Sequence, residues 1–166
     1  MIPGVQVVIL DSDFLSAFLK IERLPLVRDF FGADILWVPP AVYREISLTD
    51  LLSPVIAIPW IQVRTPDPAR VRALSPREDF AKLGPGEQEA IALSLEIGEA
   101  VLLTNDNRAR QAAAALGLKV FNVPTFLLAC KMAGLTDREQ MAEIVRGLEE
   151  RDRYGFRKDI RELLLA

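Results

Sequence analysis

The sequence contains no histidine and a single cysteine, Cys130, and both shortages narrow the chemistry that the protein can perform. Without histidine there is no Ser-His-Asp or Cys-His nucleophilic site and no histidine-based metal site. One cysteine alone cannot build a disulfide framework within the chain, which fits a reducing compartment. Any catalysis must therefore come from other groups, and carboxylates are the main candidates.

The sequence also has no excess of positive charge and no long apolar run. The net charge is −3, so no overall positive field favours nucleic acid, although a local basic patch can still bind it. No stretch approaches the length of a membrane span, and the N-terminus lacks the basic and apolar segments of a secretory signal. We therefore expect a cytoplasmic protein that makes no use of a membrane.

Short apolar runs alternate with helical patterns along the 166 residues. Runs at residues 7–10, 35–38, 60–64, 101–103 and 119–121 are typical of buried strands. Helical patterns between these runs, and three helices expected over about residues 124–166, would cover the sheet. The sequence thus predicts a single α/β domain over residues 1–166, with three α/β/α layers and a mainly parallel sheet of about four to five strands.

The segment over residues 47–84 is the least regular part of the chain. It contains many prolines, and a broken, exposed helix is expected over residues 69–83. It is also the region richest in positive charge: Arg64, Arg70, Arg72, Arg77 and Lys82. A solvated face and a surface for substrate or a partner are equally good interpretations of these charges.

Aspartates follow two of the predicted strands. Asp11 ends the first strand, and Asp106 lies in the loop and helix cap that follow the run at 101–103. Ligands of open α/β sheets bind at the carboxyl ends of the strands, so both positions suggest a functional site. Ser12 or Asp13 is expected to cap the helix that follows the first strand, which leaves Asp11 without a capping role.

Glutamates lie on the helices beside these strands. Glu45 follows Val42 by three positions, so its carboxylate can reach inward from the edge of a buried stripe. Glu87 shares its stripe with apolar positions, whereas Glu89 shares one with Glu96, so Glu87 is the better inward candidate. A solvated position remains the alternative for Glu45, and attraction to the helix dipole remains the alternative for the other two.

A parallel sheet would bring four of these carboxylates to one crevice: Asp11, Glu45, Glu87 and Asp106. Clustered carboxylates repel one another unless a divalent cation lies between them, and ligation by oxygen alone selects Mg²⁺ or Mn²⁺ over zinc. Such a site suits the attack of a metal-activated water on a phosphodiester.

The same stretches resemble the PIN-domain family, a metal-dependent nuclease fold, and particularly its short prokaryotic single-domain members. The resemblance covers nearly the whole chain and rests on the order of its motifs, which are VVILDSDFLSAFL, ILWVPPAVYREI, GEQEAIALSLEIG, AVLLTNDNRAR and LGLKVFNVPTFLLACKMAGL. It implies that the catalytic residues and metal ligands are Asp11, Glu45, Glu87 and Asp106. The residues expected to flank the site are Ser12, Asp13, Glu89, Thr104 and Asn107.

The resemblance implies an endoribonuclease that acts on single-stranded RNA as the toxin of a toxin-antitoxin pair, with an antitoxin protein as partner. The helices expected over about residues 124–166 could offer a dimer surface, so a homodimer is a further expectation. Two other classes stay open. Asp11 and Asp13 also match the opening motif of haloacid-dehalogenase-like phosphatases, although Asp106 is only one of the two later acids which that class uses. The chain could also be a PIN-like module that binds nucleic acid without cleaving it, with the acids merely capping helices.

Overall fold

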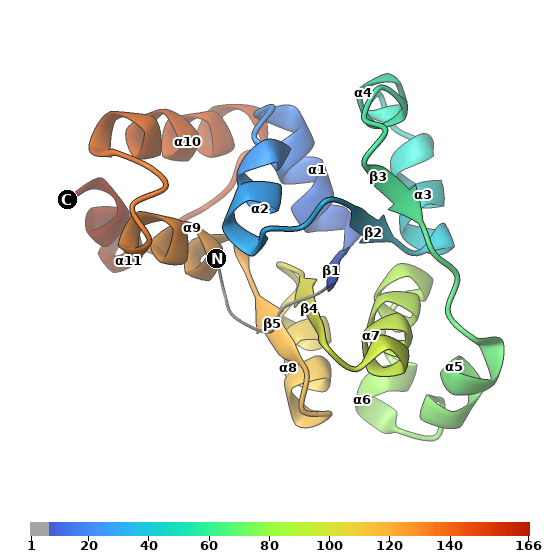
Figure 1. Ribbon diagram of the computed structural model, residues 1–166. Coiled ribbons are helices and arrows are strands. Elements are labelled where there is room, and N and C mark those ends of the chain that lie inside the picture. The colour runs from blue at the N-terminus through green and yellow to red at the C-terminus, as the bar shows by residue number, and fades with distance from the viewer. Residues whose placement is uncertain (1–6) are drawn as a thin grey trace.

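A five-stranded sheet runs through the middle of the computed structural model, which describes residues 7–166 (Figure 1). Its strands are β1 (Val7–Leu10), β2 (Leu36–Val38), β3 (Ile61–Val63), β4 (Ala100–Leu103) and β5 (Lys119–Phe121). The order across the sheet is β3-β2-β1-β4-β5, and all neighbouring strands are parallel. The predicted α/β fold with a mainly parallel sheet is confirmed.

Helices cover both faces of this sheet (Figure 1). They are α1 (Ser12–Lys20), α2 (Leu24–Phe31), α3 (Pro40–Ser47), α4 (Leu52–Ile56), α5 (Pro68–Leu74), α6 (Glu78–Ala81), α7 (Pro85–Ile97), α8 (Asn107–Ala115), α9 (Val123–Met132), α10 (Arg138–Arg151) and α11 (Lys158–Leu165). Helices α5 and α6 are the two pieces of the broken helix expected over residues 69–83. The sequence does not predict helix α4, because this region is rich in proline. The helix forms nevertheless, since Pro54 lies in its first turn, where a missing N–H is tolerated.

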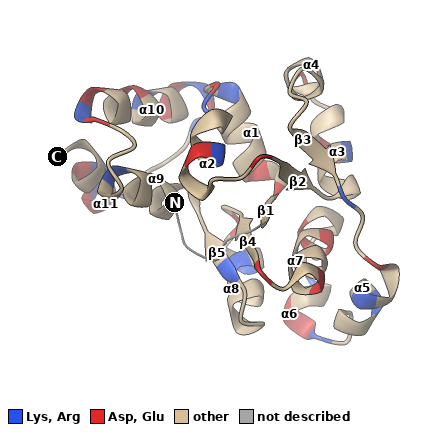
Figure 2. Cartoon of the chain, viewed as in Figure 1, with Lys and Arg blue, Asp and Glu red and all other residues tan. Residues whose placement is uncertain are grey.

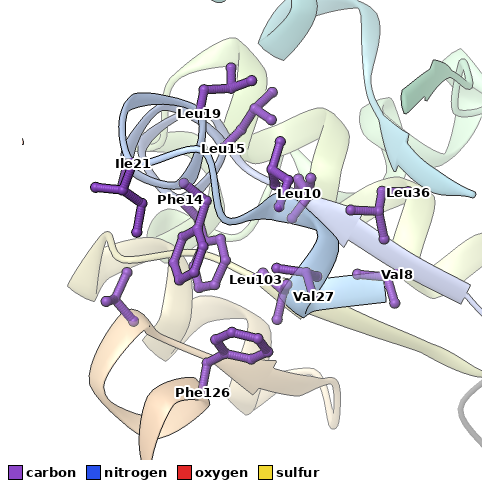
Figure 3. Close-up of a cluster of buried hydrophobic side chains, with 14 of the residues drawn as sticks. Val8, Leu10, Phe14, Leu15, Leu19, Ile21, Val27, Leu36, Leu103 and Phe126 are labelled. Carbon is purple, nitrogen blue, oxygen red and sulfur yellow. The ribbon is translucent and has the colours of Figure 1, made fainter. Parts of the chain in front are cut away.

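Each face of the sheet carries its own hydrophobic core. On one face Val8 and Leu10 pack with α1, α2 and α9, and Figure 3 shows Phe14 and Phe126 meeting within this cluster. The ring centroids of Phe14 and Phe126 are 5.7 Å apart with an interplanar angle of 78°, a favourable edge-to-face contact. On the other face Ile9 belongs to a second cluster with residues of α7 and α8. Because side chains alternate along a strand, β1 is buried on both sides.

The central strands determine where the polar residues leave the sheet. Leu10 of β1 is level with Leu103 of β4, so Asp11 and Thr104, the next residues, leave the same edge side by side. The N–H of Asp11 donates to the carbonyl oxygen of Leu103 at 2.9 Å, which extends the pairing by one more bond. The carboxyl ends of β1 and β4 are thus held together by backbone geometry.

Helices α10 and α11 were expected to cover the sheet, but they lie farther out. Helix α10 packs on α1 and α11, and α11 packs on α9, so α1 and α9 separate them from the strands (Figure 1). The segment between them, residues 152–157, returns toward the carboxyl end of the sheet, where Tyr154 bonds to Asn105. Within residues 7–166, no helix has the length and apolar character needed to cross a membrane.

Candidate active site

Asp11 begins α1 at the carboxyl end of β1, where it is only 2% exposed. Its Oδ1 accepts the N–H of Ser12 at 2.8 Å, and its Oδ2 accepts the hydroxyl of Thr104 at 2.7 Å. Burial raises the pKa of Asp11 to about 7, and the charge of Asp13 adds to the rise, while the two hydrogen bonds oppose it. Asp11 therefore lies in a site that strongly disfavours its negative charge.

The expected capping roles around Asp11 are wrong. Helix α1 starts at Ser12, so Asp11 is its N-cap residue, and Ser12 and Asp13 lie in the first turn. The reason is tertiary, because the N–H of Asp11 still belongs to the sheet and pairs with Leu103. The helix can only start once that residue has left the strand.

Thr104 connects the two strand ends. Its side chain is fully buried, and its hydroxyl donates to Asp11 while accepting the N–H of Asp106 at 3.2 Å. A hydroxyl can donate and accept at the same time, so this one group holds both aspartates in a defined relation. The placement of Thr104 beside the acids agrees with its expected flanking role.

Asp106 is the N-cap residue of α8, as the sequence predicts for the loop after β4. Its Oδ1 accepts the N–H of Ala109 at 2.9 Å, which leaves the other carboxylate oxygen for further ligands. Asn107, expected to flank the site, is exposed in the first turn, and its Oδ1 accepts a bond from Arg110 at 2.9 Å.

Asp13 lies between the ends of α1 and β4. Its Oδ1 accepts the N–H of Phe14 at 2.8 Å and the N–H of Asn105 at 3.2 Å. Partial burial of the carboxylate raises the pKa of Asp13, and the nearby charge of Asp106 adds to this, although the side chain still reaches solvent. Asp13 thus belongs to the same electrostatic group as Asp11 and Asp106.

Glu87 extends this group from the first turn of α7. Its Oε2 accepts the N–H of Gly84, the N-cap residue, at 3.0 Å. This is one half of a capping box, because glycine has no side chain that could return the bond. Partial burial raises the pKa of Glu87, and repulsion from Asp106, Asp13 and Glu45 raises it further. The charge of Glu87 is therefore near those of the acids at the strand ends.

Glu89 has a structural role that its helical stripe does not predict. Instead of pointing outward with Glu96, its Oε2 accepts the N–H of Ala41 at 2.7 Å. Ala41 lies in the first turn of α3, whose N-cap position holds Pro39 and offers no side-chain acceptor. Glu89 supplies that acceptor and ties α7 to α3.

Glu45 lies on an exposed side of α3, against the start of α7. A Cβ on Gly86 would stand 2.7 Å from Oε1 of Glu45 and 3.0 Å from Cγ2 of Val42. The missing side chain of Gly86 thus allows α3 and α7 to approach and leaves room for the carboxylate. Glu45 reaches along the start of α7, where its charge acts on Glu87, and not into the core.

The acids surround the ends of β1 and β4 without forming a compact ligand cluster. In the part of the chain that the structure describes, no three or more His, Cys, Asp or Glu side chains stand close enough to hold a metal ion. Four of these carboxylates each accept a hydrogen bond from a backbone N–H close to them in the chain: Asp11, Asp13, Glu87 and Asp106. The donor set nevertheless fits a hard divalent cation, because it offers only oxygen ligands whose mutual repulsion a cation would relieve.

Two contributors to this region had no expected role. The sequence places Asn105 in the loop and helix cap after the run at 101–103, and it gives Tyr154 no role. In the structure the hydroxyl of Tyr154 donates to Oδ1 of Asn105 at 3.0 Å, although they are 49 positions apart in the chain. The periodicity of a single sequence does not predict a contact between residues that are so far apart in the chain.

The fold is that of open α/β proteins, a class that binds ligands at the carboxyl edge of a parallel sheet, and acidic side chains surround that edge here. A family model described as PIN domain matches residues 7–165. The chain belongs to the PIN-domain family. PIN domains are typically nucleases and generally use divalent metal ions. A search of curated proteins finds no match.

Proposed function

We propose that the protein is an endoribonuclease that hydrolyses single-stranded RNA with Mg²⁺ or Mn²⁺. The group of acids at the ends of β1 and β4 carries this proposal, because its carboxylates repel one another and three of them have raised pKa values. The residues that would hold the cation are Asp11, Glu45, Glu87 and Asp106. When bound, the cation would activate a water and stabilise the charge that develops on the phosphodiester.

The protein's own groups would keep the ligands in place. Thr104 holds the carboxylate of Asp11 through its hydroxyl and the backbone of Asp106 through its oxygen. Gly84 holds Glu87 through a backbone N–H. These bonds restrict the side chains before a cation or RNA arrives, which lowers the entropic cost of assembling the site.

The first prediction concerns the metal. The purified protein should cleave a single-stranded RNA oligonucleotide in Mn²⁺ or Mg²⁺, lose this activity in EDTA, and regain it when metal is added in excess. Gel analysis of the products measures this, with an Asp106→Asn variant purified identically as the control for contaminating nuclease. Cleavage that persists in EDTA would overturn the proposal. RNA binding without cleavage in either metal would favour the module that binds nucleic acid without catalysis.

The second prediction separates Glu87 from Glu89. Glu87→Gln should weaken Mn²⁺ binding by about 10-fold or more, because it removes a charge that faces the other acids. Glu89→Gln should bind Mn²⁺ like the parent, since an amide oxygen can still accept the N–H of Ala41. Calorimetric titration of both variants measures the affinities. The opposite ranking would show that Glu89 is the ligand.

The phosphatase alternative and the predictions about biological role are affected differently by the family match. The match of residues 7–165 to the PIN-domain model removes the support for a phosphatase, and a covalent phosphate trapped on Asp11 would restore it. The toxin role, an antitoxin partner, a homodimer and a cytoplasmic location stay predictions, because they rest on the resemblance to toxin-like members and on composition.

A further inference from the structure

RNA that approaches this site meets a group of negative charges. A polyanionic strand therefore needs positive charge or hydrogen-bond donors beside the acids. The loop and helix after β4 carry two such groups, the side-chain amide of Asn105 and the guanidinium of Arg110. Neither group is bonded to an acidic side chain anywhere in residues 7–166.

The amide of Asn105 is held in one orientation. Its Oδ1 accepts the N–H of Val123 at 3.4 Å and the hydroxyl of Tyr154 at 3.0 Å. A backbone N–H can only donate, so the oxygen must be the end of the amide that faces Val123. The Nδ2 group, with its two donor hydrogens, therefore points to the opposite side.

These two donors are unpaired within residues 7–166 and are not fully buried. Nδ2 of Asn105 makes no hydrogen bond to any residue from 7 to 166. Across the same residues, Oγ1 of Thr136 is the one buried side-chain N or O atom that lacks a partner. Nδ2 is therefore not completely buried, and Asn105 as a whole is partly exposed.

Asn105 also lies directly beside the acids. Its backbone N–H donates to Oδ1 of Asp13 at 3.2 Å, and its chain neighbours Thr104 and Asp106 both belong to the site. A phosphate bound to its side chain would therefore lie next to the group of carboxylates and not across the molecule from it.

Arg110 offers the matching positive charge one helical turn beyond Asp106. Its Nη2 donates to the neutral Oδ1 of Asn107 at 2.9 Å, and Arg110 forms no ion pair with any of residues 7–166. Burial raises the pKa of Tyr154, and the charge of Arg110 opposes that rise, so Arg110 lies near the tyrosine. Figure 2 shows positive charge on α8, the helix that carries Arg108 and Arg110.

Tyr154 is itself well supported. Its half-buried ring packs against Phe156 with centroids 4.6 Å apart. Two residues earlier, Asp152 pairs with Lys20 of α1 at 2.8 Å, which ties the segment between α10 and α11 to the core. The hydroxyl that holds Asn105 thus comes from an anchored segment.

We propose that the amide of Asn105 and the guanidinium of Arg110 bind the RNA phosphate next to the scissile one, and that Tyr154 positions the Asn105 amide. This inference rests on the proposed function. Both groups are planar donors suited to phosphate oxygens, and charge-assisted bonds of this kind are among the stronger hydrogen bonds in proteins. Tyr154 acts through Asn105 and need not touch the RNA.

The test measures steady-state cleavage of a single-stranded RNA oligonucleotide and its salt dependence. Asn105→Ala and Arg110→Gln should each raise KM by about 10-fold with little change in kcat, because they remove uniform binding. Tyr154→Phe, which keeps the ring, should raise KM by about 5-fold. Arg110→Gln should also reduce the slope of log binding constant against log salt by about 0.7, the value for one phosphate contact on a single strand.

Matched controls are present elsewhere in the chain. Arg146 on α10 is an exposed arginine without an ion pair to residues 7–166, and Tyr43 on α3 is a half-buried tyrosine, so Arg146→Gln and Tyr43→Phe should behave like the parent. Parent-like KM and salt slope in Arg110→Gln and Asn105→Ala would overturn the phosphate site. A parent-like KM in Tyr154→Phe would overturn the positioning role.

Direct binding of the same RNA, followed by fluorescence anisotropy in EDTA, separates this inference from the function on which it rests. A parent protein that neither binds nor cleaves RNA would remove both proposals together. A parent protein that cleaves RNA, with variants that bind as tightly as it does, would remove the phosphate site alone.

Discussion

Replacement of Asp11 by asparagine is expected to reduce RNA cleavage by more than about 100-fold, because even residues that only support metal ligands cost about 10- to 100-fold when changed. The substitution removes the charge between the ends of β1 and β4. It retains a side-chain oxygen for the N–H of Ser12, and asparagine caps helices about as well as aspartate. Cleavage at saturating Mn²⁺, together with a thermal melt, measures both effects.

Asp137→Asn is the matched control for this variant. Asp137 is also an N-cap aspartate, and its Oδ1 accepts the N–H of Gln140 at 2.8 Å at the start of α10. It should therefore lose neither cleavage nor much stability. Strong cleavage by a folded Asp11→Asn protein would show that the carboxylate of Asp11 is not needed, and that its role is to cap α1.

The strands of this protein could be predicted because the type of each residue in them indicates burial. The runs at 7–10 and 101–103 are apolar at every position, which requires a strand covered on both faces, and both core clusters bear this out. The aspartates that follow them could then be placed at the carboxyl edge by topology alone. Their expected proximity follows from parallel pairing and needs no knowledge of side-chain contacts.

The start of α1 could not be predicted in the same way. Asp11, Ser12 and Asp13 are all good N-cap residues, so local preference does not choose among them. The choice is made by the bond from the N–H of Asp11 to Leu103 of β4, which is a tertiary contact. Sequence periodicity predicts single helices and strands, and it does not predict a hydrogen bond between two of them.

Glu89 and Tyr154 have contacts that the sequence does not predict, for a related reason. Helical spacing predicts which residues lie on the same face of a helix, but it does not predict which other element packs against that face. For Glu89 the neighbour is the first turn of α3, and for Tyr154 it is the loop after β4. Both residues therefore gain their roles from elements that are distant in the chain, which no local pattern records.

The metal-free protein is expected to lose stability between about pH 4 and pH 7 because of Asp11. Its pKa rises from 3.8 in the unfolded chain to about 7 in the folded one. Below pH 4 both states hold the proton. Between these values the unfolded state releases the proton while the folded state keeps it, so the free energy of unfolding falls as pH rises. Above pH 7 both states are ionised and the loss is complete, at roughly 4 kcal/mol.

Asp11→Asn should remove this dependence, because the amide does not ionise. In EDTA the variant should therefore gain stability relative to the parent as pH rises from 4 to 7, by up to roughly 4 kcal/mol. Urea unfolding at a series of pH values measures the difference, and Asp137→Asn should run parallel to the parent. Comparison of variant with parent isolates Asp11 from Asp13 and Glu87, whose raised pKa values act in the same direction.

Mn²⁺ should restore much of the parent's stability at pH 7, since a ligand that binds only the folded state stabilises it. The same addition should have little effect on Asp11→Asn. If Asp11 only capped α1 as an ordinary ionised carboxylate, the parent and the variant would differ by a constant amount from about pH 4 to pH 7, and Mn²⁺ would not distinguish them. Parallel stability curves would therefore show that the folded protein carries Asp11 ionised throughout, which is incompatible with the buried, crowded carboxylate described above.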